Sequence, residues 1–152
     1  KAYAMTGWRV GFACGPKEII AAMTKIHQYT IMCVSITSQM AACEAITTGR
    51  KSVEEMKREY KRRREFVIAE LNRIGLPSAK PHGAFYAFPS IKNAHLTSME
   101  FSQRLLKEQK VAVVPGTAFG KNGEGYIRIS YASSIENLKE ALRRIELFLK
   151  KL

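Results

Sequence analysis

The sequence predicts an α/β protein whose 152 residues divide into two unlike parts. Helical and strand-like patterns alternate along the chain, one helical pattern over residues 52–75 lasts for roughly six turns, and the character of the sequence changes after Pro77. We therefore expect a first part over residues 1–51, a long connecting helix over 52–75, and a compact α+β lobe over 76–152 that folds around its own core.

The first part has the pattern of one strand followed by two helices. Residues 7–15 (GWRVGFACG) predict a strand, and Pro16 suits the first turn of the next helix, because its missing N–H costs nothing there. A second helix, rich in small residues, is expected over about 36–48 and ends near Gly49. Since one strand does not make a sheet, this part requires partner strands.

The connecting helix has signals at both ends. Ser52 and Glu55 have the spacing of a capping box, and Gly75 followed by Pro77 ends the helix. Apolar positions recur between them at helical intervals. The outer face carries the basic run KREYKRRRE over 57–65, which is typical of a solvated helix face.

Three strands are expected in the last lobe, over residues 83–89, 111–116 and 126–132. The third, YIRISYA, alternates, so that the apolar neighbours of Arg128 face the core and Arg128 faces a polar cleft. A fixed guanidinium in such a cleft suits the carboxylate of a small substrate.

Two helices complete this lobe. Thr97 and Glu100 form a capping-box pattern that opens a helix through about Gln109. Ser133 with Glu136 is expected to cap the last helix, whose apolar stripe continues from there.

Composition limits the possible classes of function. Apolar residues make up 46% and charged residues 25% of the chain, which is the balance of a globular protein, and no apolar run approaches the roughly 20 residues of a membrane span. The three cysteines have unrelated spacings and predict reduced thiols in a cytosolic protein. The three histidines do not pair with them at ligand spacing, so no metal site is expected.

The net charge of +12 raises a second class of function, a nucleic-acid-binding module. The distribution of the charge argues against it. Nucleic-acid readers interleave basic and exposed aromatic residues, whereas here the basic residues lie on predicted amphipathic helices and the aromatic residues in predicted strands. We therefore expect no nucleic-acid partner, and a steep salt-dependent affinity for RNA would reverse this expectation.

Four motifs, in order, carry a resemblance to a known family. They are KAYAMTGWRVGFACG over 1–15, KPHGAFYAFP over 80–89, VAVVPGTAFG over 111–120 and GYIRISYASS over 125–134. The whole chain resembles the class I/II, fold-type I, pyridoxal-phosphate-dependent aminotransferases, in particular their aspartate aminotransferase-like branch. The resemblance implies the C-terminal portion of such an enzyme, starting at the lysine that binds the cofactor.

The resemblance also assigns the regions and the site residues. It implies that 1–51 is the C-terminal part of the large cofactor-binding domain and that 76–152 is the small α+β domain. Lys1 is the catalytic residue, whose amine attaches to pyridoxal 5′-phosphate and later acts as the general base on the substrate Cα. Arg9 binds the cofactor phosphate, and Arg128 binds the substrate α-carboxylate.

The implied activity is transfer of an amino group between an L-amino acid and a 2-oxo acid, by a ping-pong reaction, in a cytoplasmic homodimer. A related fold-type I lyase stays open as an alternative, because the same three residues would serve it. Aspartate, aromatic amino acids and alanine all stay open as substrates. Since the family holds the cofactor ring with residues upstream of this lysine, residues 1–152 alone are expected to bind the cofactor weakly and not to transaminate.

Overall fold

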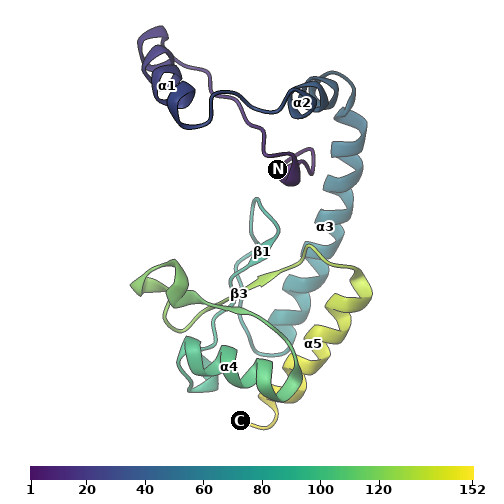
Figure 1. The fold of residues 1–152 in the computed structure, drawn as a ribbon. Coiled ribbons are helices and arrows are strands. Elements are labelled where there is room, and N and C mark those ends of the chain that lie inside the picture. Colours follow the sequence, from purple (N-terminus) through teal and green to yellow (C-terminus); the bar gives the residue numbers. More distant parts are fainter. The chain divides into compact units, whose positions relative to one another are not determined.

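The computed structural model describes residues 1–152, which form two compact units, Lys1–Lys57 and Arg58–Leu152 (Figure 1). The first unit holds the short helix η1 (Thr6–Trp8), the helices α1 (Lys17–Thr30) and α2 (Ile36–Thr48), and the beginning of α3 (Arg50–Arg73). The second holds the rest of α3, the strands β1 (Tyr86–Ala87), β2 (Val114–Pro115) and β3 (Ile127–Ser130), the helices α4 (Ser98–Gln109) and α5 (Ile135–Leu149), and the short helices η2 (Lys92–Ala94), η3 (Gly116–Phe119) and η4 (Lys121–Gly123). None of the helices has the length and apolar character needed to cross a bilayer.

In the first unit, the strand predicted over residues 7–15 is wrong. The segment contains the end of η1 and then an irregular path into α1. A strand needs a neighbouring strand to satisfy its backbone hydrogen bonds, and all three strands of the structure belong to the second unit. The two predicted helices are confirmed, since α1 follows Pro16 and α2 spans the expected residues.

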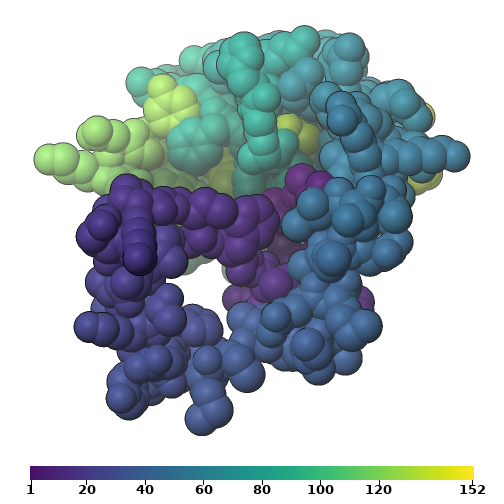
Figure 2. All heavy atoms as spheres, turned by 90° about the horizontal axis from the view of Figure 1, so that it is seen from above, coloured from purple at the N-terminus to yellow at the C-terminus, as the bar shows by residue number.

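The first unit buries little of its own side-chain surface. Ser38 is its one buried residue, whereas Phe12, Tyr29 and Met32 are 82%, 86% and 78% exposed. In the space-filling view, the purple and blue spheres of this unit surround an open gap (Figure 2). The unit therefore has no hydrophobic core of its own, and local backbone contacts define its shape.

The capping box predicted at Ser52 and Glu55 is also wrong, because α3 begins earlier, at Arg50. Gly49, the residue after α2, keeps helical geometry with φ −73° and ψ −2°. Its carbonyl then accepts a hydrogen bond from the Val53 N–H at 3.2 Å. The backbone thus keeps helical hydrogen bonding past Gly49, and Ser52 lies inside α3 rather than at its N-cap position.

The second unit is built on a three-stranded antiparallel sheet in the order β1-β3-β2. Tyr86 of β1 pairs with Ser130, and Val114 of β2 pairs with Arg128. All three strands are shorter than predicted, since only these short stretches form ladders. The central position of β3 gives Arg128 a neighbouring strand on each side.

The hydrophobic core lies entirely within the second unit. Phe101 of α4 meets Phe148 of α5 edge to face, with ring centroids 5.2 Å apart, and both rings are fully buried. Complete burial of a side chain of this size contributes about 1.5–3 kcal/mol. The buried apolar residues are Val67, Leu71, Leu76, Ala87, Ile91, Phe101, Leu105, Ile127, Tyr131, Leu138, Leu142, Ile145 and Phe148.

Hydroxyl groups cap α4 and α5. Thr97 forms the predicted capping box, in which its hydroxyl accepts from the Glu100 N–H and the Glu100 carboxylate accepts from the Thr97 N–H. For α5 the prediction is wrong by one residue, because Ser134, not Ser133, accepts from the Asn137 N–H. Ser133 and Ser134 are both residues that can cap a helix. Ser134 does so because α5 begins at the next residue, Ile135.

Two glycine backbones hold η3 against η4. A Cβ added to Gly116 would overlap the carbonyl oxygen of Gly123, and one added to Gly123 would overlap that of Gly116. Because these obstacles are backbone atoms rather than flexible side-chain ends, neither position admits a side chain without movement of the loop.

Gly116→Ala is therefore expected to destabilise the second unit by about 1–3 kcal/mol, the usual cost of overpacking. Amide hydrogen exchange over residues 114–126 measures the loss. Gly83→Ala is the matched control, since no atom lies within 4 Å of a Cβ built at Gly83. Equal protection of the loop in the two variants would contradict the expectation.

Glu146 ties α5 to the end of α3. Its carboxylate accepts from the Arg73 guanidinium at 2.9 Å and pairs with the Lys150 ammonium at 3.0 Å. The hydrogen bond from Arg73, followed by that from Lys150, lowers the pKa of Glu146 from 4.5 to about 2. The folded state therefore holds this carboxylate ionised over a pH range in which the unfolded chain binds a proton.

Glu146→Gln is expected to lower the unfolding midpoint at neutral pH, and the difference from wild type should shrink as the pH falls from 4.5 towards 2. The sign follows because a lowered pKa stabilises the fold above the unfolded value and ceases to do so below the folded one. Thermal melts at stepped pH measure it, with Glu108→Gln as the control for loss of an ion pair within one helix. A difference that stays constant with pH would refute this role.

Candidate active site

The chain between Lys1 and Arg9 forms two tight turns. The Ala4 N–H donates to the Lys1 carbonyl oxygen at 3.0 Å, and the Trp8 N–H donates to that of Met5 at 3.1 Å. Ala4 has a φ of 54°, in the left-handed region that residues with a side chain rarely adopt. These turns shorten the path from Lys1 to Arg9, and both residues are exposed in the first unit.

Arg9 follows directly after η1 and also has a left-handed backbone, with φ 52° and ψ 44°. Its Nη1 donates to the Thr6 carbonyl oxygen at 3.0 Å, which turns the guanidinium back over the loop. Its side chain forms no ion pair with any carboxylate of the chain. The other N–H donors of Arg9 are thus available to an external anion.

Ser38, in the first turns of α2, anchors this loop. Its hydroxyl donates to the Trp8 carbonyl oxygen at 2.7 Å, across 30 residues of sequence. Ser38 is 6% exposed, so the hydrogen bond is shielded from water. It fixes the backbone next to Arg9, and no pattern in the sequence indicates this contact.

The side chains of this loop fit the groups that pyridoxal phosphate presents. Lys1 carries a primary amine, which reacts with an aldehyde, on a long tether. Arg9 carries a planar guanidinium that matches a phosphate in two parallel hydrogen bonds. The donor set therefore suits the cofactor at both of its ends.

Arg128, the third predicted residue, lies in the second unit and is half-buried on β3. Its Cζ lies 4.4 Å from the ring centroid of Tyr86 and 4.4 Å from that of Phe119. The two rings do not pair with each other, and each contacts the guanidinium separately. No carboxylate of the chain pairs with Arg128, which leaves its N–H edge available.

Further aromatic rings extend from Phe119, one of the two rings beside Arg128, in a series of contacts. Phe88 meets Phe119 edge to face at a centroid distance of 6.0 Å and stacks on Tyr126 at 5.5 Å. The Lys92 ammonium in turn lies 5.5 Å from the Tyr126 ring. We call the four rings of Tyr86, Phe88, Phe119 and Tyr126 the aromatic row.

Neither Tyr86 nor Phe119 is a predicted site residue. The sequence could have indicated Tyr86. Its predicted strand comes before the strand of Arg128, and two strands that pair place side chains on a common face. No local signal points to Phe119, which comes from η3 and reaches Arg128 only through the fold of the loop.

Phe85, the residue before β1, packs against the core. It is half-buried and stacks on Tyr60 with ring centroids 5.9 Å apart. The backbone next to it is fixed by Tyr131, whose hydroxyl donates to the Ala84 carbonyl oxygen at 3.1 Å and whose N–H donates to the Phe85 carbonyl oxygen at 2.9 Å. Burial raises the pKa of Tyr131, which keeps its hydroxyl a donor.

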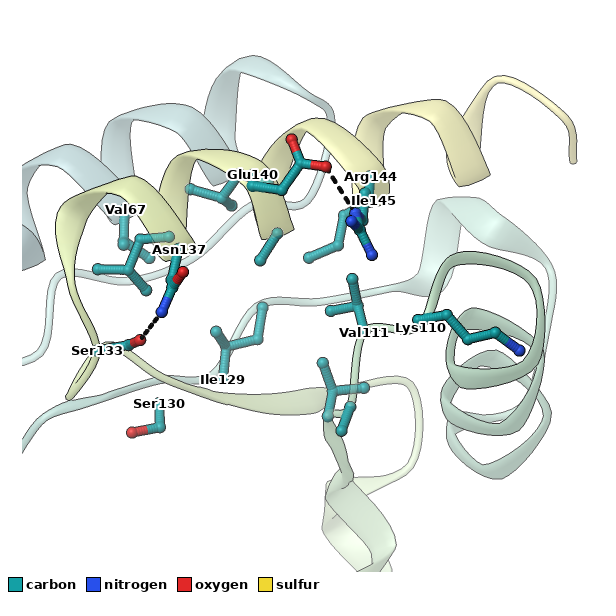
Figure 3. Close-up of a pocket in the computed structure, with 15 residues that line it drawn as sticks. Val67, Lys110, Val111, Ile129, Ser130, Ser133, Asn137, Glu140, Arg144 and Ile145 are labelled. Carbon is teal, nitrogen blue, oxygen red and sulfur yellow. Dashed lines mark hydrogen bonds and ion pairs between the residues drawn. The ribbon is translucent and has the colours of Figure 1, made fainter.

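A cavity of about 410 Å³ lies between α5 and β3 in the second unit (Figure 3). Val111, Ile129 and Ile145 contribute apolar side chains to its lining. The charged groups of Glu140 and Arg144 on its wall pair with each other at 2.7 Å. Because it contains no predicted site residue and its opposite charges are paired, we assign it no chemistry.

The cysteine and histidine side chains form no metal site. No group of three or more histidine, cysteine, aspartate or glutamate side chains in the chain could hold a metal ion. Cys14, Cys33 and Cys43 are free and exposed. The candidate chemistry of the chain therefore rests on Lys1 and Arg9 in one unit and Arg128 in the other.

Comparison with solved structures defines the class of protein. The fold is that of the fold-type I aminotransferases. An aromatic aminotransferase from Pyrococcus horikoshii OT3 matches with a TM-score of 0.95 and 53% identity, over 99% of this chain and 41% of that one. An aspartate aminotransferase from Thermus thermophilus, solved with maleate, matches with a TM-score of 0.91 and 41% identity, over 97% of this chain and 38% of that one.

Sequence comparison then gives the family. The family model "Aminotransferase class I and II" matches residues 1–145. The putative aminotransferase YugH of Bacillus subtilis (strain 168) is 55% identical over 99% of this chain and 39% of its own length, and an aspartate aminotransferase of Pyrococcus abyssi is 55% identical over 96% and 38%. The chain belongs to the class I and II aminotransferases, whose members use pyridoxal phosphate, and it spans 38–39% of the length of these two relatives.

Proposed function

We propose that this chain supplies the C-terminal part of a pyridoxal-phosphate-dependent aminotransferase, which moves an amino group between an L-amino acid and a 2-oxo acid. Relatives named as an aspartate aminotransferase and as an aromatic-amino-acid aminotransferase, at 55% and 51% identity, favour transamination over the lyase alternative. The observation that carries the proposal is Arg128, a half-buried residue whose guanidinium lies beside two aromatic rings and has no carboxylate partner in the chain. Such a group is suited to a carboxylate that arrives from solution.

We also propose the domain assignment that the motifs imply. Residues 1–51 would end the large domain, 52–75 would form the connecting helix, and 76–152 would form the small domain. The lack of a core in the first unit and the core of the second support separating 1–51 from 76–152, and Val67 and Leu71 of the connecting helix contribute to that second core.

Each site residue has a defined task in the proposed reaction. Pyridoxal phosphate, when bound, supplies the electron sink that stabilises negative charge on the substrate Cα. Lys1 would hold the cofactor through Nζ and, once the substrate amine takes that position, Nζ accepts the Cα proton. Arg9 would hold the phosphate, and Arg128 would hold the substrate carboxylate, which fixes the direction of the Cα–H bond.

A cytoplasmic homodimer is part of the same proposal. The three free cysteines suit a reducing compartment. Many apolar side chains of the first unit are exposed, which suits a unit that is covered by other polypeptide in the assembled enzyme.

The test is an assay of the complete enzyme, loaded with pyridoxal phosphate, against L-aspartate, L-phenylalanine, L-tyrosine and L-alanine, each with 2-oxoglutarate. We expect glutamate and the matching 2-oxo acid to appear in equal amounts, with parallel-line kinetics because the reaction is ping-pong. Release of ammonia without glutamate would instead support the lyase alternative and overturn the proposal.

Residues 1–152 alone are expected to show no transamination and only weak binding of the cofactor, because the first unit has no core or sheet to surround the ring. Equilibrium titration with pyridoxal phosphate and the same assay check this. An α-amine at Lys1 of this polypeptide can also condense with aldehydes, so an N-acetylated chain is the control. Robust turnover by the chain without any other polypeptide would refute the expectation.

A further inference from the structure

We propose that Tyr86 and Phe119 are positioning residues that hold the guanidinium plane of Arg128, so that only its N–H edge meets the substrate carboxylate. This inference rests on the proposed function of Arg128 and assigns a role to two residues outside the motif roles described above. We call the pair the aromatic clamp.

The two rings of the aromatic clamp lie at equal distances from the guanidinium carbon of Arg128. The Cζ of Arg128 lies 4.4 Å from each ring centroid, well inside the roughly 6 Å over which a cation is attracted to a ring face. The two rings come from different elements, Tyr86 from β1 and Phe119 from η3. The position of Arg128 between these contacts therefore depends on two separate elements of the second unit.

The orientation of the Arg128 guanidinium depends on the two rings, because no ion pair holds it. Most other arginines of the second unit are oriented by a carboxylate, as Arg73 is by Glu146, whereas Arg128 forms no ion pair. A paired carboxylate would also occupy the edge that the substrate requires. Aromatic faces orient the guanidinium while leaving its N–H donors free, so the clamp combines a fixed orientation with an open binding edge.

The backbone around Phe119 supports a positioning role. Its ring is 51% exposed, so core packing alone does not explain its position. The contact between the Gly116 and Gly123 backbones fixes the loop that carries it. Phe88 supports the ring edge to face at 6.0 Å. The loop therefore places an exposed ring at one location, over Arg128.

The experiment compares two variants at each ring position of the complete, cofactor-loaded enzyme. Phe119→Leu and Tyr86→Leu keep an apolar side chain but remove the ring face, while Phe119→Tyr and Tyr86→Phe keep the ring. We expect the leucine variants to raise KM for the amino acid by about 3- to 30-fold, with kcat changed less than about twofold, and the ring-retaining variants to stay near wild type.

Tyr126→Leu is the matched control. It removes a ring from the aromatic row and from its contact with Lys92, but that ring does not contact Arg128. We expect its KM to stay near wild type. A rise as large as that of Phe119→Leu would show that general packing of the row, rather than the clamp, sets KM, and would overturn the proposal.

Binding of maleate, which has two carboxylates and no amino group, gives a readout that does not depend on turnover. Its Kd, measured by calorimetry on the enzyme with and without cofactor, should rise in Phe119→Leu by the same factor as KM. The Kd of the cofactor should not change. A fall in kcat with unchanged KM and unchanged maleate Kd would contradict the clamp.

The outcomes also separate this inference from the proposed function. If wild type transfers amino groups and both leucine variants match it, the clamp is wrong and the function stands. If wild type transfers none, the proposed function fails. Should Phe119→Leu not fold, Tyr86→Leu against Tyr86→Phe makes the same comparison on the other face.

Discussion

Lys1→Ala in the complete enzyme is expected to reduce amino-group transfer by more than about 10³-fold. The substitution removes the amine that would hold the cofactor and the base that accepts the Cα proton, and a positioned base alone contributes about 10²–10⁴-fold. Steady-state kinetics with a saturating amino acid and 2-oxoglutarate measure the loss. Lys17→Ala is the matched control, since Lys17 is an exposed lysine at the start of α1 in the same unit.

Chemical trapping tests the same residue independently. Borohydride reduction of the loaded wild-type enzyme, followed by peptide mapping, should place the cofactor on the ε-amine of Lys1. A label on another lysine, or full activity of Lys1→Ala, would remove Lys1 from the proposed mechanism.

Arg128→Leu should reduce kcat/KM for the amino acid by about 10²–10⁴-fold, because it deletes two hydrogen bonds between charged groups, each worth about 1.5–3 kcal/mol. Arg128→Lys should recover only part of this, since an ammonium keeps the charge but cannot form the planar fork. Initial rates over a range of amino acid concentrations give the values.

Arg104→Lys is the control for this substitution. Arg104 also lies over an aromatic ring, with its Cζ 5.5 Å from the ring centroid of Phe148, but it is paired with Glu108 on the same helix. We expect its kcat/KM to match wild type. If Arg128→Lys also retained wild-type kcat/KM, a bidentate grip on the carboxylate would be refuted.

Part of the fold could be predicted from residues that are neighbours in the sequence. The bounds of α2 and the capping box of Thr97 and Glu100 follow from residues within a few positions of each other, and the structure confirms them. The alternation around Arg128 is only partly seen, because Ile127 is buried but Arg128 and Ile129 are both half-buried, and aromatic rings lie beside Arg128. The failed strand prediction has a non-local cause, unlike the two helix starts that were misplaced by a residue or two. The strand expected over 7–15 needed a neighbour, and a local pattern does not contain its neighbours.

The candidate site, like the fold, could be predicted only in part from the sequence. Lys1, Arg9 and Arg128 are carried by motifs, and their roles stay predictions until the experiments above are done. The contacts that orient them are long-range: Ser38 reaches Trp8 across 30 residues, and Phe119 reaches Arg128 through a turn whose geometry the sequence does not state. Such long-range contacts can be identified only from the folded structure.

The glycine contact between η3 and η4 has a practical consequence for engineering. Gly116 and Gly123 must be retained because of their backbone contact, and Gly120 because its φ of 115° is one that residues with a side chain rarely adopt. Phe119 has neither constraint, so it is the position of this loop to vary. If the proposed function holds, a library randomised at position 119 alone is expected to change KM for the amino acid more than kcat.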